Sequence, residues 1–410
     1  AKSVCRLLQI RTEQLIPLFN GIINELCLDR VTVSLDIDGV SGIMLTKFFN
    51  AEKIIAQKIN LLKSAADNDN ANALDGLIDN YQTLNNITLH ENQKNAIKTA
   101  INCGVSVITG GPGTGKTTII KAILFINRAN NKTTQLLAPT GRAAKRICET
   151  TGADAQTIHR GLDIDYKGAG GKAFTFDNPD NCIKTDFVVV DEVSMCDAVL
   201  CSQLLRKIMA GTRTVFVGDI DQLPSVGAGN VLADIIDSGV VPVVRLTEIY
   251  RQSDKSTIAI NARRINCGEI PLLDNKSEDF FFEYAATPEE IRDKVLTLTT
   301  ARLPKYLGDN NNIQVLAPMK SGTAGVNNLN FVLQSALNPE SEGKMQYCYG
   351  DITFRAGDRV MHTVNNYKQE WTRNGENGKG VFNGDIGVIR AINEDDGEIT
   401  VEMEDGRETV

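Results

Sequence analysis

The sequence predicts an α/β fold with a parallel sheet, and two observations carry that prediction. From residue 88 onward, short apolar runs alternate with amphipathic helical stretches, the pattern of parallel strands joined by helices. From residue 346 onward, the segments are short, β-rich and punctuated by glycine, which favours a small β-barrel. Because 410 residues exceed one compact core, we expect roughly two to four domains.

Residues 1–86 are expected to form helices around a hairpin. Apolar side chains recur at helical spacing over residues 11–28. The elements expected next are strands Val31–Leu35 and Val40–Leu45 joined at Asp38-Gly39, a helix over 48–64 and a loop over Asp67–Asn72. Helix, hairpin, helix resembles a winged-helix fragment; a small helical prefix that only packs on the next domain is an equally good interpretation.

Residues 87–278 are expected to form the first α/β domain. Its strand candidates are Val105–Thr109, Gln135–Ala138, Phe187–Val190, Thr214–Val217 and Val243–Leu246. A second unit over 279–344 offers strand Phe280–Phe282, helix Pro288–Leu303, strand Ile313–Ala317 and a helix from about Gly325. Residues 345–410 would be a β-rich insertion in that second unit.

The composition, 42% hydrophobic and 23% charged, is ordinary for a globular protein. No apolar run approaches the roughly 18 residues that span a bilayer, and no signal-peptide pattern opens the chain. The nine cysteines include no CxxC pair, and the spacing of Cys196 and Cys201 suits no zinc site. We therefore expect a cytoplasmic protein with reduced thiols and no membrane partner.

The net charge of −8 is unevenly distributed. Residues 391–410 carry −7, which leaves the first 390 residues at about −1. The acidic side chains of this segment, opposed by Arg407 alone, are Glu394, Asp395, Asp396, Glu398, Glu402, Glu404, Asp405 and Glu408. A nearly neutral chain can still line one groove with cations, so total charge does not exclude a nucleic-acid partner.

Residues 110–117, Gly-Gly-Pro-Gly-Thr-Gly-Lys-Thr, match the phosphate-binding pattern GxxxxGK[ST] between an expected strand and helix. Glycines let backbone N–H groups surround phosphate oxygens, and the helix N-terminus adds favourable partial charge. Lys116 would reach the β- and γ-phosphates, and Thr117 would ligate Mg²⁺. The predicted ATP-binding residues here are Gly111, Pro112, Gly113, Thr114, Gly115, Lys116, Thr117 and Thr118.

Four later residues complete a hydrolytic site. Asp191 and Glu192 follow an apolar strand; Asp191 would hold Mg²⁺ and Glu192 would polarise the attacking water. Gln222 follows another strand, where it could sense the γ-phosphate. Arg251 could stabilise transition-state charge, as arginine fingers do. Singly, Gln222 and Arg251 could equally be surface residues.

In order, these motifs resemble the RecD family of superfamily-1 DNA helicases (the exodeoxyribonuclease V alpha chain), with some similarity to TraA-type helicases, from about Leu89 to Ile389. The family's Q motif is similar to Thr88–Gln93, which implies that Gln93 reads adenine. The remaining matches are motif II at Asp191–Met195, motif III at Gly218–Pro224, motif IV at Tyr250–Gln252 and the start of an SH3-like insertion at Val381–Gly387. The resemblance implies RecA-like P-loop domains.

DNA-contacting positions are implied by the same resemblance. Pro139, Thr140, Gly141 and Arg142 resemble motif Ia, whose loop could offer N–H groups and a guanidinium to phosphates. His159 lies in a TIHR element; the family context favours a DNA contact over a purely structural role. Lys320 and Gly325 resemble a backbone-gripping segment. Asn365, with residues 366–367 and Trp371, could offer a stacking surface, although burial in a small barrel is equally compatible.

Residues 162–184 resemble the hairpin, or pin, against which the family splits duplexes; an ordinary surface hairpin is the alternative. Two later family motifs are absent before Val410, and Ala1 stands where a Met would begin a protein. We therefore expect a fragment with an incomplete second RecA-like unit that binds ATP·Mg²⁺ weakly and hydrolyses it poorly.

The resulting prediction is an ATP-dependent, 5′-to-3′ DNA helicase of recombination or repair. Its partners would be single-stranded DNA, duplex junctions and possible RecBCD-like subunits; any nuclease would belong to such a subunit. A DNA-binding scaffold with a silent ATP site is the main alternative. A small-molecule kinase would not need Gln222, the Tyr-Arg-Gln element or a second α/β unit.

Overall fold

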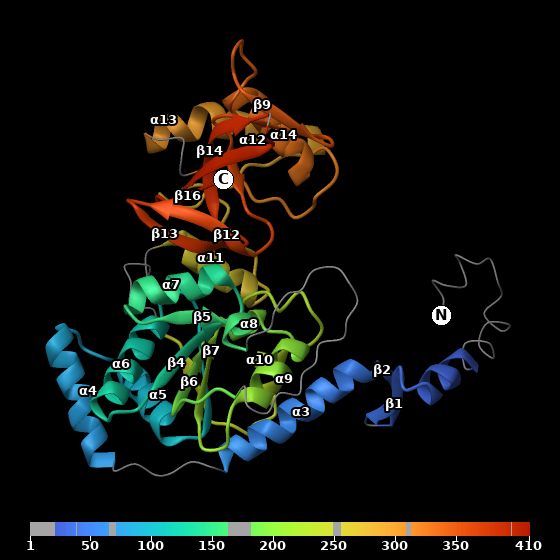
Figure 1. The fold of residues 1–410 in the computed structure, drawn as a ribbon. Helices are drawn as coiled ribbons and strands as arrows, with labels where there is room; N and C mark the ends of the chain where they lie inside the picture. Colours follow the sequence, from blue (N-terminus) through green and yellow to red (C-terminus); the bar gives the residue numbers. More distant parts are fainter. Residues whose placement is uncertain are drawn as a thin grey trace. The chain divides into compact units, whose positions relative to one another are not determined.

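The computed structural model describes residues 21–37, 39–64, 71–162, 182–248, 256–308, 313–394 and 396–410 (Figure 1). The chain divides into two compact units, unit 1 over Ala1–Asp254 and unit 2 over Lys255–Val410. Among the described residues, none of the helices has the length and apolar character that crossing a bilayer requires.

Unit 1 contains a six-stranded sheet in the order β5-β4-β6-β7-β3-β8, and every strand pair in it is parallel. Its strands are β3 (Val105–Gly110), β4 (Thr134–Ala138), β5 (Ala155–Thr157), β6 (Phe187–Val190), β7 (Arg213–Gly218) and β8 (Val243–Leu246). The five predicted strands all form, and the predicted parallel α/β class is confirmed. The three-residue strand β5 was not predicted, because it is too short to show a periodic pattern of apolar residues.

Helices cover both faces of this sheet, because successive side chains of a strand point to opposite faces. In β6, Val188 and Val190 join one buried cluster, whereas Phe187 and Val189 join the other. The first cluster is closed by α3 (Thr46–Lys63), α9 (Ala198–Lys207) and α10 (Val231–Asp237). The second is closed by α4 (Ala71–Asn85), α5 (Glu91–Asn102), α6 (Lys116–Ala129) and α7 (Gly141–Thr151).

The N-terminal elements are a helix over residues 21–28, the antiparallel hairpin of β1 (Thr32–Ile37) and β2 (Val40–Leu45), and α3. The predicted strands and following helix therefore form, and residues 11–20 lie outside the described residues. Helix α3 packs along α9 and buries Ile55, Ile59 and Leu62 against the sheet. The winged-helix-like interpretation of residues 1–86 stays a prediction.

Unit 2 begins with helices and ends in a β-rich part, of which the sequence predicted the β-rich end and two of the helices. Its helical elements are α11 (Thr257–Asn266), α12 (Pro288–Thr297), the π-helical turn η3 (Leu298–Arg302), α13 (Leu303–Leu307) and α14 (Val326–Leu337). An antiparallel hairpin joins β9 (Gln346–Tyr349) and β10 (Ile352–Arg355). The remaining strands are β11 (Arg359–Met361), β12 (Asn366–Arg373), β13 (Glu376–Val381), β14 (Ile386–Asn393), β15 (Glu398–Met403) and β16 (Glu408–Thr409).

The six strands β11 to β16 form one antiparallel sheet in the order β11-β14-β15-β16-β12-β13. The side chain of Arg407, which is 7% exposed, ties this sheet together from within. It donates to Asp385 at 2.7 Å, to Asp405 at 2.8 Å and to the Gly380 carbonyl at 3.0 Å. These contacts satisfy the buried guanidinium and hold the turn after β13 against β16. The predicted β-rich character of this part is confirmed.

Two strands predicted in the second unit were wrong. Phe280–Phe282 and Ile313–Ala317 are irregular, with no strand partner among the described residues. Phe281 is 56% exposed and Leu316 is 89% exposed. An apolar run becomes a strand only where a neighbour completes its hydrogen bonds, and neither run has one here.

Candidate nucleotide-binding site

The loop over residues 110–117 forms a strand–loop–helix turn between β3 and α6, as predicted. Gly113 and Gly115 have φ values of +80° and +89°, in the left-handed region that glycine adopts without strain. Gly115 is the N-cap of α6, and a Cβ added there would lie 2.2 Å from Gln93 Nε2. The loop thus depends on glycine for both conformation and space, which leaves its backbone N–H groups free to face an anion.

The ammonium of Lys116 lies over this loop. Its Nζ donates to the Gly110 carbonyl at 2.5 Å and to the Gly111 carbonyl at 2.9 Å. Thr114 Oγ1 also donates to the Gly111 carbonyl, at 2.8 Å, which closes the loop from within. The lysine therefore sits where phosphate oxygens would replace carbonyl oxygens as its partners. The next residue, Thr117, is exposed in the first turn of α6, and its hydroxyl is available to a metal ion.

Gln93 lies at the start of α5 and is 5% exposed. Its Oε1 accepts from the His90 N–H at 3.0 Å, which completes a capping box, and its Nε2 donates to the Thr114 carbonyl at 3.3 Å. Both ends of the amide are therefore engaged with the protein's own backbone. Its role as adenine reader stays a prediction, and here Gln93 ties the start of α5 to the phosphate loop.

The carboxylates of motif II follow β6. Burial raises the pKa of Asp191 to about 6, and the neighbouring Glu192 adds to the rise. The Glu192 N–H, which donates to Asp191 Oδ1 at 2.9 Å, and the cations Lys116 and Arg146 act in the opposite direction. The opposing effect of Lys116 on the pKa of Asp191 agrees with a position near the phosphate loop. Glu192 has a φ of +54°, an uncommon conformation for a non-glycine residue and one often found at functional sites.

The order of the strands explains why these groups meet. Strand β7 lies between β6 and β3, so their carboxyl ends lie side by side at one edge of the sheet. Ile220 N–H, just past β7, donates to Thr109 Oγ1 of β3 at 3.2 Å. The same loop carries Gln222, which is exposed. Phosphate loop, Asp191 and Gln222 thus come from three adjacent strand ends, as the sequence predicted.

Serine 194 is a buried side chain that the motif left without a role. It lies in the short helix η1 (Val193–Met195) directly after Glu192. Ser194 is 7% exposed, and its Oγ has no hydrogen-bond partner in the described part of the chain. Such hydroxyls are uncommon in native interiors.

The motif Ia residues lie at the carboxyl end of β4. Thr140 caps α7 by accepting from the Ala143 N–H at 3.2 Å, Gly141 is buried and Arg142 is exposed. Arg146 lies one helical turn after Arg142, on the same face of α7, and reaches Asp191 electrostatically. Arg146 was not among the predicted site residues; its spacing of four from Arg142 was the available signal in the sequence.

His159 lies on the short helix α8 (Ile158–Gly161), next to β5. Burial lowers the pKa of His159, and the nearby Asp197 carboxylate acts in the opposite direction. The side chain is half-buried, so both a DNA contact and a structural role are compatible with its position.

Lys320 and Gly325 lie together at the start of α14 in unit 2. Asn327 N–H donates to the Lys320 carbonyl at 3.0 Å, and a Cβ at Gly325 would lie 2.4 Å from the Ser321 carbonyl oxygen. Asn365 Oδ1 accepts from the Asn383 N–H at 2.8 Å and so supports the turn before β14. The structure thus brings the first two together, while Asn365 belongs to the β-rich part.

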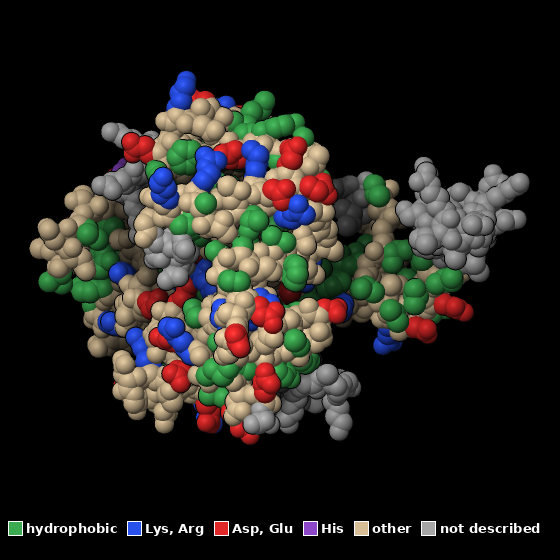
Figure 2. All heavy atoms as spheres, turned by 90° about the horizontal axis from the view of Figure 1, so that it is seen from above, with side chains coloured by type: hydrophobic (Ala, Val, Ile, Leu, Met, Phe, Trp, Pro, Cys, Tyr) green, Lys and Arg blue, Asp and Glu red, His purple; other side chains and the backbone are tan. Residues whose placement is uncertain are grey.

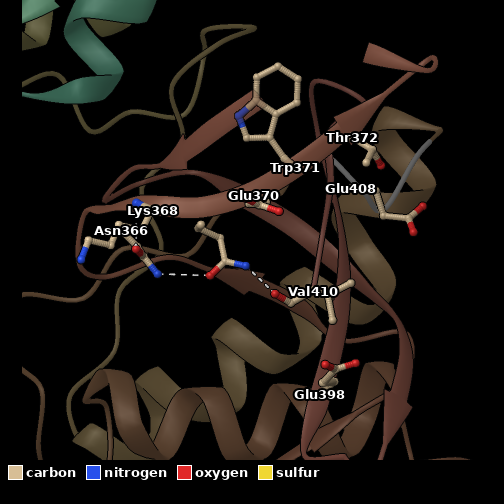
Figure 3. A pocket seen from close by; sticks show the side chains of 9 residues that line it. Asn366, Lys368, Glu370, Trp371, Thr372, Glu398, Glu408 and Val410 are labelled. Carbon is tan, nitrogen blue, oxygen red and sulfur yellow. Dashed lines mark hydrogen bonds between the residues drawn. The ribbon is translucent and has the colours of Figure 1, made fainter. Parts of the chain in front are cut away.

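Trp371 is partly buried rather than presented as a platform. A Cβ on Gly378 would lie 2.2 Å from its ring, and Arg407 Cζ lies 5.7 Å from the ring centroid. A pocket of about 520 Å³ beside it is drawn in Figure 3. It is lined by Asn366, Lys368, Gln369, Glu370, Trp371, Thr372, Glu398, Glu408 and Val410. Three carboxylates against one lysine make this pocket a poor partner for a phosphate backbone.

Two predicted features lie outside the described residues. Arg251, with the rest of Tyr250–Gln252, falls within the gap after residue 248, and most of the predicted pin over 162–184 falls within the gap after residue 162. In the described part of the chain, no group of three or more His, Cys, Asp or Glu side chains is arranged to hold a metal ion. Figure 2 shows cations and anions interspersed over one face of the molecule.

Comparison with known proteins agrees with this geometry. Residues 88–281 match an AAA domain, and residues 329–403 match the SH3 domain of ATP-dependent RecD-like DNA helicases. The chain is 33% identical to the ATP-dependent RecD2 DNA helicase of Deinococcus radiodurans, over 86% of this chain and 45% of that protein. The chain belongs to the RecD-like helicase family. The family assignment covers both units, since the two domain matches fall on the phosphate-loop domain and on the β-rich part.

Two further matches have lower sequence identity. The RecBCD enzyme subunit RecD of Mycolicibacterium smegmatis is 30% identical, over 73% of this chain and 57% of that subunit. The chain thus spans about half the length of these two curated RecD-like relatives. Among solved structures, the Pif1 helicase of Candida albicans aligns with 18% identity and a TM-score of 0.43, over 79% of this chain and 78% of that one.

Proposed function

We propose that this RecD-like chain is the ATP-dependent motor of a DNA helicase of recombination or repair. The carrying observation is that the phosphate loop, Asp191 and the Gln222 loop lie at three adjacent strand ends of one parallel sheet. A phosphotransferase needs the first two; a third, exposed glutamine loop suits a motor that must report nucleotide state to a second site.

Within this proposal, ATP·Mg²⁺ is the cofactor, and the glycines of residues 110–117 with Lys116 hold its phosphates. The side chains present suit this cofactor. Lys116 supplies a positive charge for the phosphates, and the exposed Thr117 hydroxyl and the Asp191 carboxylate supply oxygen ligands for the metal ion. When bound, Mg²⁺ neutralises developing phosphate charge. Thr117 and Asp191 are the residues that would hold the ion.

The remaining polar groups act on water and on charge. Glu192, on a left-handed backbone next to Asp191, orients and deprotonates the attacking water. Gln222 responds to the γ-phosphate, and Arg251 supplies a second positive charge. Gln93 holds the phosphate loop and meets the adenine. Opening and closing of the site then moves one unit's grip along DNA.

Single-stranded DNA and duplex junctions are the proposed partners, with 5′-to-3′ travel. Motif Ia (Pro139, Thr140, Gly141 and Arg142), His159, Lys320, Gly325 and Asn365 are the proposed contacts. Of these, Arg142 and Lys320 are exposed cations, the side chains that most often bind phosphates. RecBCD-like subunits are a further proposed partner, and the cytoplasm the proposed location.

Unwinding of forked duplexes with opposite tail polarity, by protein extended past Val410, tests this function. We expect ATP-dependent strand separation of the 5′-tailed fork and little of the 3′-tailed fork. ATP turnover should rise when single-stranded DNA is added. DNA binding without any DNA-stimulated turnover would instead support a scaffold with a silent ATP site.

We also propose that the 410-residue chain alone hydrolyses ATP weakly. The helical part of unit 2 has no parallel sheet in the described part of the chain, and α12 buries none of its residues. Side chains on helices with few buried residues are held less precisely than side chains supported by a close-packed core. Turnover of this chain that matches a full-length relative would contradict the proposal.

A further inference from the structure

We infer that Asp197 is a positioning residue that couples the DNA-contacting helix α8 to the loop carrying Gln222. This inference rests on the proposed function, because it assigns a coupling role between its two binding sites. Asp197 lies six residues after Asp191 and directly before α9, and touches neither the phosphate loop nor the predicted metal site in any described contact. It acts through its neighbours.

The first contact is the cap of α9. Asp197 Oδ1 accepts from the Leu200 N–H at 2.8 Å, which fixes the carboxylate in one orientation. This cap follows directly on η1 and Cys196, so the position of Asp197 is tied to the backbone that delivers Asp191 and Glu192. The carboxylate is thus a rigid reference point beside motif II.

The second contact is with the loop after motif III. A Cβ added to Gly227 would lie 2.1 Å from Asp197 Oδ2, so the loop backbone rests directly on the other carboxylate oxygen. Ala198 N–H donates to the Ala228 carbonyl at 3.0 Å. Ser225 Oγ, bonded to the carbonyls of Gly227 and Gly229 at 2.9 and 3.0 Å, gathers the loop into one piece.

The loop seated on Asp197 is continuous with the γ-phosphate sensor. Gln222 lies five residues before Gly227, and its own N–H donates to the Asp219 carbonyl at 3.2 Å. Residues 222–230 are exposed apart from Ser225, so few packing contacts restrain them. The seat on α9 is therefore a main restraint on where this loop, and Gln222 with it, lies.

The third neighbour is His159. Ile158 and Leu162, on either side of it, share a buried cluster with Cys196 and Ala198, the neighbours of Asp197. The Asp197 carboxylate opposes the effect of burial on the pKa of His159. His159 is the predicted DNA contact on α8. The Asp197 carboxylate therefore lies between the predicted DNA contact His159 and the loop that carries Gln222. A movement of either neighbour changes the position of the carboxylate with which the other interacts.

Linked binding measurements test this role without requiring turnover. Fluorescence anisotropy would give the affinity of a labelled oligo-dT for the protein with and without a non-hydrolysable ATP analogue. We expect the analogue to change the wild-type affinity by roughly 5-fold or more, the usual scale of coupling between sites. In Asp197→Asn, the ratio should fall to within about twofold of one.

Asparagine keeps the helix cap and the side-chain volume, so the fold should survive the change. Asp237→Asn, which removes an exposed acid from the same unit, is the matched control and should keep the wild-type ratio. Gly227→Ala should lose coupling as Asp197→Asn does, because its methyl group displaces the loop from the carboxylate. Combining Asp197→Asn with His159→Gln should add no further loss, since both break one connection.

The outcomes separate this inference from the proposed function. Coupling in Asp197→Asn as strong as in the wild type overturns the inference. A wild-type protein that binds both ligands without coupling also overturns it, while leaving the helicase assignment standing. A wild-type protein that binds neither ligand overturns both.

Discussion

Unit 1 and unit 2 bury their apolar side chains very differently. In unit 1, two clusters on either face of the parallel sheet leave side chains such as Ile97, Ile126 and Phe216 with no exposed surface. In unit 2, the buried cluster is confined to the β-rich part. Its helices leave Phe331 68% exposed and Tyr306 69% exposed. In unit 1, a sheet packed on both faces gives the candidate site a rigid support. The described helices of unit 2 have no such sheet beneath them.

This difference in packing determines how firmly each unit holds its candidate site residues. Groups at the strand ends of unit 1 are positioned by a close-packed core, so their spacing is set before any ligand arrives. The predicted contacts of unit 2, Lys320 and Gly325, lie at the start of a helix that buries only Leu329. The nucleotide residues are therefore held in place by their core, whereas Lys320 and Gly325 have little buried support.

The largest effect should come from the phosphate loop. Lys116→Ala removes the ammonium that lies over the loop and should lower kcat for ATP by at least about 100-fold, the scale of losing one transition-state donor. Lys121→Ala, an exposed lysine on the same helix, is the control and should change kcat less than about twofold. Steady-state ATPase assays with single-stranded DNA measure both. Equal activity in the two variants would remove the loop from the mechanism.

A core truncation in unit 1 should come next. Ile126→Ala opens a cavity beneath the sheet, because the side chain is fully buried on α6. Unfolding by urea should show a loss of about 2–5 kcal/mol. A loss below about 1 kcal/mol would mean that the core relaxes freely and that the contrast between the units is overstated.

Removing the buried acid should stabilise unit 1. Because the pKa of Asp191 is raised from 3.8 to about 6, its charged form is disfavoured in the folded state. The carboxylate therefore costs up to about 3 kcal/mol above pH 6, and this cost disappears as pH falls toward 4. Without nucleotide or Mg²⁺, Asp191→Asn should unfold at a higher temperature than wild type at pH 8 and at the same temperature near pH 4.

The same variant should lose Mg²⁺-dependent turnover, since a neutral amide is a poor ligand for this ion. Asp186→Asn is a useful contrast: Thr133 hydrogen bonds lower the pKa of Asp186, so that change should not stabilise the protein at pH 8. A destabilised Asp191→Asn would show that the carboxylate is held by favourable contacts instead of being strained by burial.

Much of unit 1 was readable from sequence because its signals are local. Buried strands appear as continuous apolar runs, and residues 110–117 have a spacing that only a glycine turn satisfies. The convergence of Asp191 and Gln222 followed from parallel strands sharing one carboxyl edge. Gln93 was recognised by motif, yet its hydrogen bond to Thr114 depends on tertiary packing that no local pattern records.

Unit 2 was harder because its segments depend on distant partners. The apolar runs at Phe280–Phe282 and Ile313–Ala317 have strand composition, but the described residues offer no neighbouring strand. Asn365 was read as a DNA contact, whereas its side chain here accepts a turn hydrogen bond from Asn383. Asp197 was not predicted. It caps a helix and lies against Gly227, 30 residues later, and no local sequence pattern connects these two features.

The smallest effect should come from the exposed face of α14. Phe331→Ser removes a ring that is already 68% exposed, so the free energy of unfolding should change by less than about 0.5 kcal/mol. Leu329→Ala on the same helix, at 4% exposed, should cost about 2–3 kcal/mol and serves as the internal reference. If both variants lose stability equally, the Phe331 ring is buried in solution. Helix α14 would then be packed on both faces, and the two units would differ less than described above.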